Sequence, residues 1–243
     1  MTTAPETTSD LLTATVGQLV AENPDRARIF EAFDIDYCCG GKKPLSLACR
    51  EKGLDVRHVV AALEASRKEA GAQPDATDWT QASLTDLCDH IQSTHHAYLK
   101  TEMPRLIEMG RKVTRVHGPH FAYVADIAAT FEACAAELET HMRKEEMILF
   151  PMIRQLDQHA GSGGFHCGSI ANPIRVMEME HDSAGNALAT IRQLSGGYTL
   201  PPEACHTWHA YYDALQRFEQ DLHQHVHKEN NILFPRAIQR ESA

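Results

Sequence analysis

Histidine and glutamate recur at the same spacing in two segments of the chain, residues 141–151 and 225–235. In each segment the glutamate follows the histidine by four residues, and a proline follows the glutamate by six. In a helix, a spacing of four places the two side chains one above the other on the same face. Apolar neighbours indicate that this face points inward, where a glutamate is costly unless it is paired or bound to a metal. The repeat therefore predicts metal ligands, whereas a single copy would more simply be a solvated His–Glu pair.

The duplication also predicts a histidine ligand on the helix that precedes each segment. His181 lies 44 residues before His225. Counting back from His141 reaches two candidates, His96 at a distance of 45 residues and His95 at 46. Neighbouring residues of a helix point about 100° apart, so we expect only one of these two side chains to face the core. Spacing alone leaves the choice between them open.

With one histidine of that pair, the predicted ligands are four imidazoles and two carboxylates, the others being His141, Glu145, His181, His225 and Glu229. Such a set can hold two metal ions if both glutamates bridge them. A solvent-derived bridge would make each ion five-coordinate and leave one octahedral position open. Nitrogen and carboxylate donors with open positions suit iron, and a lone catalytic zinc would not use six protein ligands. We therefore expect two non-haem iron ions per chain, bridged by Glu145, Glu229 and an oxo or hydroxo ligand.

Long helical patterns position these residues. Amphipathic periodicity predicts four helices, over residues 83–112, 119–159, 172–194 and 202–240, with Pro173 and Pro202 in first turns. No stretch shows the two-residue alternation of a strand. The expected fold is therefore all-α, an antiparallel four-helix bundle over residues 80–243.

A smaller helical domain is expected in front of the bundle. Turn-forming residues near 70–78 separate it from the bundle, and we place it at residues 11–75, after a disordered lead-in over residues 1–10. Helical periodicity within it covers residues 16–22, 26–33, 45–52 and 56–68. A segment of this size buries only a modest core, so cover from the rest of the protein or from a second copy in a homodimer is expected.

Composition excludes several classes of function. The chain has 243 residues, 43% of them hydrophobic, and a formal charge of −10 without a basic stripe, which argues against nucleic-acid and membrane partners. Seven cysteines, an odd number, without an export signal argue for a reducing compartment, and we expect a cytoplasmic protein.

Four further residues could act beside the metal ligands. Glu137 lies one turn before His141, and Glu180 is adjacent to His181, so both carboxylates should lie near the same cavity unless they are ordinary surface residues. Cys38 and Cys39 precede two glycines that permit a sharp turn, and we expect accessible thiols able to bind iron or to sense oxidation. The alternative is a structural cysteine pair packed under the turn.

The other cysteines and histidines have no second motif residue to support a role. Cysteines in helical patterns are expected to fill the core: Cys49, Cys88, Cys134 and Cys205. Several histidines are expected on the surface: His117, His120, His206, His209, His223 and His227.

The repeated helix ends resemble those of hemerythrin-like domains, with one departure. An oxygen-carrying hemerythrin has a second histidine one turn after the ligand of its third helix, where this chain has Gly185. The missing ligand implies a more open centre and argues against pure oxygen transport.

Further segments, DYCCGGK from Asp36, KEEMILFP, VMEMEHDSAG, PPEAC and ENNILFPRA, resemble the iron–sulfur cluster repair di-iron proteins, the repair-of-iron-centres family. The resemblance runs from about Leu11 to Ala237 and implies that His96 is the sixth ligand. It also implies that Glu137 and Glu180 line a path for iron. The loop with His166 and Cys167 departs from the pattern as an insertion without an assigned role.

The implied function is repair of iron–sulfur clusters damaged by nitrosative or oxidative stress, through a labile di-iron centre that donates iron or handles nitric oxide. The partners would be damaged iron–sulfur proteins, which Cys38 and Cys39 could contact, with nitric oxide or oxygen as small ligands. The alternatives are a hemerythrin-like protein that binds or senses oxygen or nitric oxide, and a di-iron nitric oxide reductase. An iron donor is favoured over a turnover enzyme.

Overall fold

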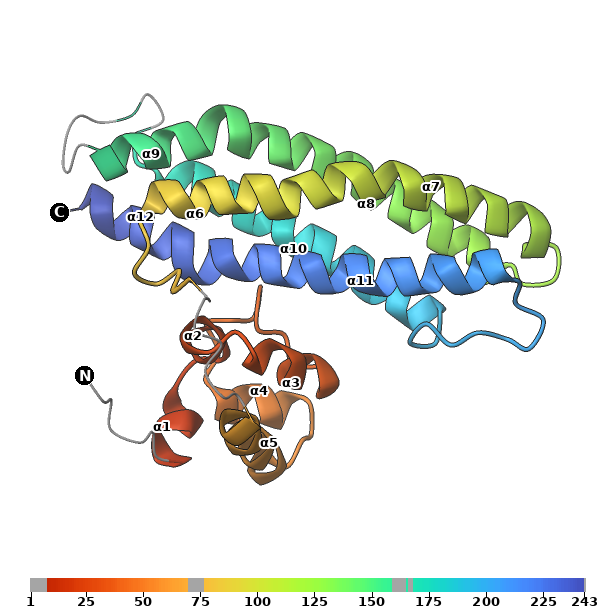
Figure 1. Ribbon diagram of the computed structural model, residues 1–243, viewed down its shortest axis with the longest axis horizontal. Coiled ribbons are helices and arrows are strands. Elements are labelled where there is room, and N and C mark those ends of the chain that lie inside the picture. The colour runs from red at the N-terminus through yellow and green to blue at the C-terminus, as the bar shows by residue number, and fades with distance from the viewer. Residues whose placement is uncertain (1–7, 70–76, 159–164, 166–167, 243) are drawn as a thin grey trace. The chain divides into compact units, whose positions relative to one another are not determined.

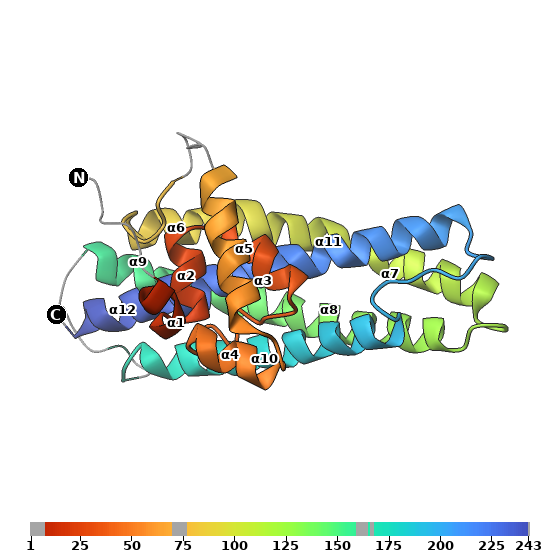
Figure 2. The same cartoon turned by 90° about the horizontal axis from the view of Figure 1, so that it is seen from below.

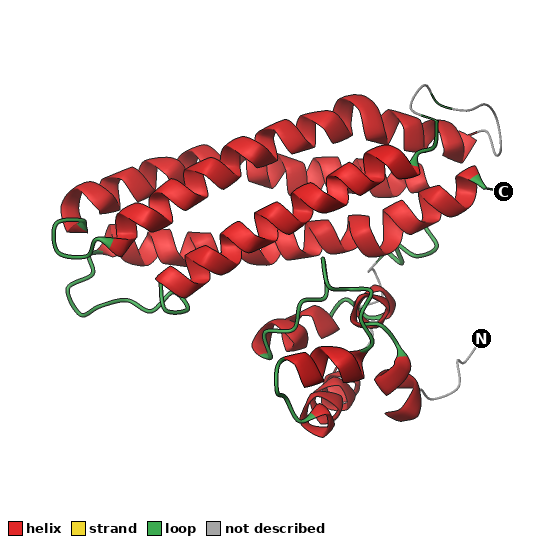
Figure 3. Ribbon diagram, turned by 180° about the vertical axis from the view of Figure 1, so that it is seen from behind, coloured by secondary structure: helices red, strands yellow, loops and turns green. Residues whose placement is uncertain are grey.

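The computed structural model describes residues 8–69, 77–158, 165 and 168–242, and these residues form helices and loops without a strand (Figure 3). Contacts divide the chain into two units, residues 1–83 with 226–236 and residues 84–225 with 237–243. The last helix is continuous across this division, so it contributes residues to both units. None of the described helices combines the length and apolar character that a bilayer span requires. The all-α fold predicted from periodicity is confirmed.

Five short helices make up the N-terminal part of the first unit (Figure 2): α1 Thr8–Thr13, α2 Val16–Glu22, α3 Arg26–Ala32, α4 Leu45–Glu51 and α5 Val56–Glu69. Their apolar faces meet in a small core around Val16, Leu19, Phe30 and Leu45. Helix α2 begins with a capping box, in which the Thr15 side chain accepts the Gln18 N–H and Gln18 binds back. Helix α1 begins inside the stretch expected to be disordered, and residues 1–7 lie outside the described residues.

Four long helical runs form the bundle, in which the second run packs against both the first and the third (Figure 1). Three of the runs consist of two α-helical parts joined by a five-residue π-helix. The runs are α6 Leu84–Ile91, η1 Gln92–His96 and α7 Ala97–His117; α8 Tyr123–Lys144, η2 Glu145–Leu149 and α9 Phe150–Gln158; α10 Ala171–Leu194; and α11 His206–Lys228, η3 Glu229–Leu233 and α12 Phe234–Glu241.

Three helix ends differ from the sequence-based expectation by four residues or more. The first run continues to His117, five residues beyond the predicted end. The second run begins at Tyr123, after a turn in which the Phe121 N–H binds the His117 carbonyl. The fourth begins at His206, so Pro202 lies in the preceding loop and is not in a first turn.

A glycine brings the first and fourth runs together. A Cβ atom at Gly110 on α7 would lie 2.8 Å from the phenol oxygen of Tyr211 on α11. A methyl group at this position would require the buried Tyr211 side chain to shift. Buried Phe131 and Phe218 pack edge to face nearby in the bundle core, with ring centroids 5.1 Å apart.

Candidate metal centre

Each π-helix contains one of the residues predicted to bind metal. His96 is the last residue of η1, Glu145 is the first of η2, and Glu229 is the first of η3. A π turn closes with an i to i+5 hydrogen bond and is wider than an α turn, and such turns are frequent at functional sites. The Phe150 N–H reaches the Glu145 carbonyl in this way, and the Phe234 N–H reaches the Glu229 carbonyl.

The π turns were not predicted from the sequence, although a proline of the repeated motif marks two of them. Pro151 and Pro235 each lie two residues beyond the end of a π-helix. Proline lacks the backbone donor that a helix interior needs, and its ring crowds the carbonyl four residues earlier. The repeated proline was therefore a usable signal for a local departure from α-helical geometry.

The structure brings together all six residues of the predicted ligand set. They form two groups whose ligand atoms lie within 4.8 Å of one another: His96, Glu145, His225 and Glu229, and His141, Glu145, His181 and Glu229. Glu145 and Glu229 belong to both groups, and both are fully buried. Each group therefore offers two imidazole nitrogens and two carboxylate oxygens.

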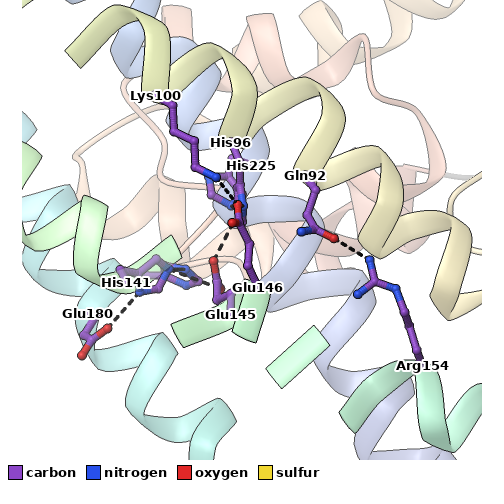
Figure 4. A network of polar contacts seen from close by, with 10 residues as sticks. Gln92, His96, Lys100, His141, Glu145, Glu146, Arg154, Glu180 and His225 are labelled. Atoms are coloured by element: carbon purple, nitrogen blue, oxygen red, sulfur yellow. Dashed lines mark hydrogen bonds and ion pairs between the residues drawn. The ribbon is translucent and has the colours of Figure 1, made fainter. Parts of the chain in front are cut away.

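The carboxylate of Glu145 reaches toward both groups at once. Its Oε2 lies 3.3 Å from Nε2 of His96, and its Oε1 lies 3.3 Å from Nε2 of His141 (Figure 4). Within the groups, the Nε2 atoms of His96 and His225 are 3.2 Å apart, and those of His141 and His181 are 3.0 Å apart. Nitrogen lone pairs and carboxylates converging in a buried space are the donor set of a two-metal site, so the residues fit such a centre.

Two outer carboxylates fix the orientation of the imidazoles. Nδ1 of His96 lies 2.8 Å from Glu146 Oε1, and Nδ1 of His141 lies 2.9 Å from Glu180 Oε2. An ionised carboxylate only accepts hydrogen bonds, so each Nδ1 donates and each Nε2 keeps its lone pair for a metal.

Each of these carboxylates also pairs with a lysine, Lys100 for Glu146 and Lys144 for Glu180. Partial burial by itself raises the pKa of both carboxyl groups. The hydrogen bonds from the lysine and the histidine outweigh burial, so the pKa of each lies below its usual value.

Both members of the His95 and His96 pair are buried, so the expectation that only one faces the core was wrong. His96 joins the metal groups. His95 instead points to helix α11, where its Nδ1 lies 2.9 Å from Asp221 Oδ1 and its ring stacks on that of His225. The first helical run is enclosed on more than one face where it carries η1, so both adjacent side chains, His95 and His96, are buried.

Glu137 and Glu180 lie in the wall of one cavity of about 570 Å³ between α8 and α10. His141 and Lys144 line the same cavity, and Ser183 donates a hydrogen bond of 3.0 Å to Glu137. Glu137 is exposed and Glu180 is partly buried, so both carboxylates are accessible to a solute entering the cavity.

The two cysteines of the glycine-ended turn differ in exposure. Cys38 is buried and only Cys39 is partly exposed, so the expectation of two accessible thiols was wrong for Cys38. The hydrogen bond with Cys39, burial and the nearby Asp36 raise the pKa of Cys38 well above its usual value. Cys38 is therefore a protonated thiol, and Cys39 is the member that a solute can reach.

Other expectations are corrected by the structure. His227 is buried against Tyr37, and burial lowers its pKa to about 4. Cys205 is exposed near His117, whereas Cys49, Cys88 and Cys134 are buried as predicted. His166 and Cys167 lie outside the described residues.

Comparison with known proteins places the chain in a family. The hemerythrin HHE cation-binding domain matches residues 88–237, and a domain of unknown function, ScdA_N, matches residues 12–67. The chain is 40% identical to the iron–sulfur cluster repair protein YtfE of Citrobacter koseri, over 92% of this chain and 96% of that protein. It is 37% identical, with the same coverage, to a probable iron–sulfur cluster repair protein of Haemophilus influenzae. The chain therefore belongs to the hemerythrin HHE cation-binding family and, over most of its length, to the family of these iron–sulfur cluster repair proteins.

Proposed function

We propose that this protein repairs damaged iron–sulfur clusters by donating iron from a labile di-iron centre. The observation that carries the proposal is the pair of four-donor groups that share Glu145 and Glu229. The relatives are named for iron–sulfur cluster repair, which supports repair as the process. The imidazole and carboxylate donors support iron as the metal that is delivered. Iron(II) and iron(III) both accept imidazole and carboxylate ligands, so the same residues can hold iron in either state.

In this proposal the six ligands hold two iron ions, which Glu145, Glu229 and an oxo or hydroxo ligand bridge. Glu145 supports the bridging role because its two oxygens point to different histidines. Gly185 supports lability because glycine offers no side-chain ligand one turn after His181. An iron centre with an open position exchanges ligands more readily than a closed one.

Glu137 and Glu180 would form the path by which iron leaves the bundle. The two carboxylates lie in the wall of the same cavity as the ligand His141. A cation that loses its histidine ligands could be held by these oxygens before it reaches water. Lys144 neutralises Glu180 in the resting state and would have to release it for this step.

Cys39 and Cys38 would contact the damaged client or receive iron. The partly exposed Cys39 is the reactive member, and Cys38 keeps its proton. The clients would be iron–sulfur proteins of the cytoplasm, because the cysteines of the described residues are free, as is typical of a reducing compartment.

The decisive experiment mixes the iron-loaded protein with an iron–sulfur dehydratase inactivated by nitric oxide. The protein is loaded with ⁵⁷Fe, and both the recovered dehydratase activity and the label in the rebuilt cluster are followed. We expect recovery faster than with an equal concentration of free ferrous iron, and ⁵⁷Fe in the cluster. The Glu229→Leu variant, which lacks one shared ligand, should give only the free-iron rate.

Three results would contradict iron donation. Recovery equal to that with free iron, with no label leaving the protein, excludes it. Nitrous oxide formed over many turnovers would favour a nitric oxide reductase instead. Reversible binding of oxygen or nitric oxide with neither transfer nor turnover would favour a carrier or sensor.

A further inference from the structure

The two halves of the internal repeat differ at the residues next to the ligands. Glu146 follows the ligand Glu145 in the first copy, and Asn230 follows Glu229 in the second. The residue just before the ligand His96 is His95, whereas the residue just before the ligand His181 is Glu180. The ligands are duplicated but their surroundings are not, so the two metal positions need not behave alike.

The position formed by His96 and His225 is enclosed on both sides. Behind His96, Glu146 Oε1 accepts hydrogen bonds from the histidine at 2.8 Å and from Lys100 at 2.6 Å (Figure 4). Behind His225, the ring of His95 stacks at a centroid distance of 5.5 Å and an interplanar angle of 4°. Both ligand histidines are fully buried.

A cavity of about 610 Å³ between α7 and α8 approaches this position but does not reach it. Its wall ends at Lys100 and Glu146, and among the described residues that line it there is no ligand histidine. The charged pair therefore separates the cavity from His96. A solute in the cavity meets Glu146 and Lys100 before it can reach a metal ligand.

The position formed by His141 and His181 differs in this respect. The cavity between α8 and α10 has His141 itself in its wall, together with Glu180, the carboxylate that orients it. The side chain of Glu180 is 32% exposed, compared with 22% for Glu146. This cavity therefore extends to a ligand of the second position, whereas the α7–α8 cavity ends at the charged pair. The His141 side chain is buried, and Lys144 pairs with Glu180 beside it, so a solute meets that pair together with the ligand.

We propose that the two iron positions are unequal in lability. The ion bound by His141 and His181 is the exchangeable one and leaves through the α8–α10 cavity. The ion bound by His96 and His225 is retained, and Glu146 is the positioning residue that retains it by fixing the His96 ring and strengthening its basicity. This inference rests on the proposed di-iron centre and identifies which of its two ions is donated.

The test follows iron release to a colorimetric ferrous chelator by stopped-flow spectroscopy, using reduced protein loaded with ⁵⁷Fe. We expect two phases, each with an amplitude of one iron per chain. Mössbauer spectra taken after the first phase should show one remaining iron environment. Release in a single phase of two irons would overturn the proposal.

Matched variants show which of the two cavities the iron of the fast phase leaves through. Val176→Trp places a large side chain at the exposed mouth of the α8–α10 cavity and should slow the fast phase at least fivefold. Ile107→Trp, the equivalent change in the α7–α8 cavity, should leave both phases unchanged. If Ile107→Trp slows the fast phase and Val176→Trp does not, the exit is on the other side.

Glu146→Gln tests retention. Loss of a carboxylate that supports a ligand histidine typically weakens metal binding by about 10–100-fold, so the slow phase should accelerate by a similar factor. The Mössbauer signal of the retained iron should change, and that of the exchangeable iron should not. Glu132→Gln removes another carboxylate from the same cavity and serves as the control. Acceleration of only the fast phase in Glu146→Gln would refute the assignment.

Failure of the unequal iron positions can be distinguished from failure of the proposed function. If the wild-type protein transfers iron to a damaged cluster but releases it in one phase, only the unequal positions are refuted. If the protein binds fewer than two irons, or transfers none, the proposed function itself is refuted. Circular dichroism of each variant establishes that it is folded.

Discussion

Removal of one ligand side chain should affect iron content far more than removal of a neighbouring buried histidine. We expect about two irons per chain in the wild type and a strong loss in His141→Leu and Glu229→Leu, because each change removes a donor and Glu229 serves both groups. Iron is measured by plasma emission spectrometry after anaerobic loading. Full loading of both variants would refute the ligand assignment.

His95 and His96 provide a matched pair for the same measurement. His96→Leu should lose iron, whereas His95→Leu should keep much more of it because His95 contacts Asp221 and stacks on a ligand without belonging to either donor group. The surface variant His120→Leu controls for the loss of an imidazole. Equal iron loss in His95→Leu and His96→Leu would show that the His95 ring is a ligand or is required to hold His225.

Cysteine reactivity should separate the exposed thiols from those of the core. Burial, with a smaller contribution from Glu137, raises the pKa of Cys134 to about 12, so at pH 10 only about one per cent is thiolate. We expect iodoacetamide to modify Cys205 at pH 8 and to leave Cys134 unmodified up to pH 10. Peptide mass spectrometry measures both sites in the folded protein. Modification of Cys134 at the same rate as Cys205 would mean that α8 opens readily.

At the scale of elements, periodicity and spacing were sufficient to predict the long helices and five of the six residues that the structure gathers into the donor groups. Hydrophobic spacing fixes which face of a helix is buried, and the duplicated His–Glu pairs fix where the donors lie on that face. Spacing left the choice between His95 and His96 open, because a residue count cannot distinguish two neighbours on a π-helix. The family resemblance implied His96, and the structure places His96, not His95, in the donor groups. The exposure of Cys205 and the burial of Cys38 and His227 likewise depend on contacts between residues distant in sequence.

The turn that carries Cys38 and Cys39 is held to the fourth helical run chiefly by Asn231 of η3, beside the contact of His227 with Tyr37. Within the first unit, Asn231 donates a hydrogen bond of 3.0 Å to the Cys38 carbonyl and lies against the backbone of Gly17 and Gly41. A Cβ at Gly41 would lie 2.2 Å from the Asn231 side-chain oxygen, which no real Cβ contact allows. The absence of side chains at the two glycines is therefore what permits this contact.

A double-mutant cycle tests this contact. Gly41→Ala should lower the free energy of unfolding by about 1–3 kcal/mol, the range typical of overpacking. The same substitution in an Asn231→Ala background should be nearly neutral, because the nearest atoms that crowd the new methyl group are all from Asn231. Urea unfolding measures the four free energies. Equal losses in both backgrounds would place the clash elsewhere.

At the scale of the whole molecule, iron should contribute much of the stability. Glu145 and Glu229 are fully buried in a shared set of donors, and bound cations compensate buried carboxylates. A ligand present at a thousand times its dissociation constant stabilises the folded state by about 4 kcal/mol. For a protein of this size, each kcal/mol raises the melting temperature by about 2–4 °C, so iron loading should raise it by roughly 8–16 °C.

Differential scanning calorimetry of the iron-free and iron-loaded protein measures that difference. Glu229→Leu, which removes a ligand from both groups, should show little increase on addition of iron, whereas His120→Leu should show the full increase. A melting temperature of the wild type that does not change with iron would mean that the donor groups do not bind it tightly in the folded state.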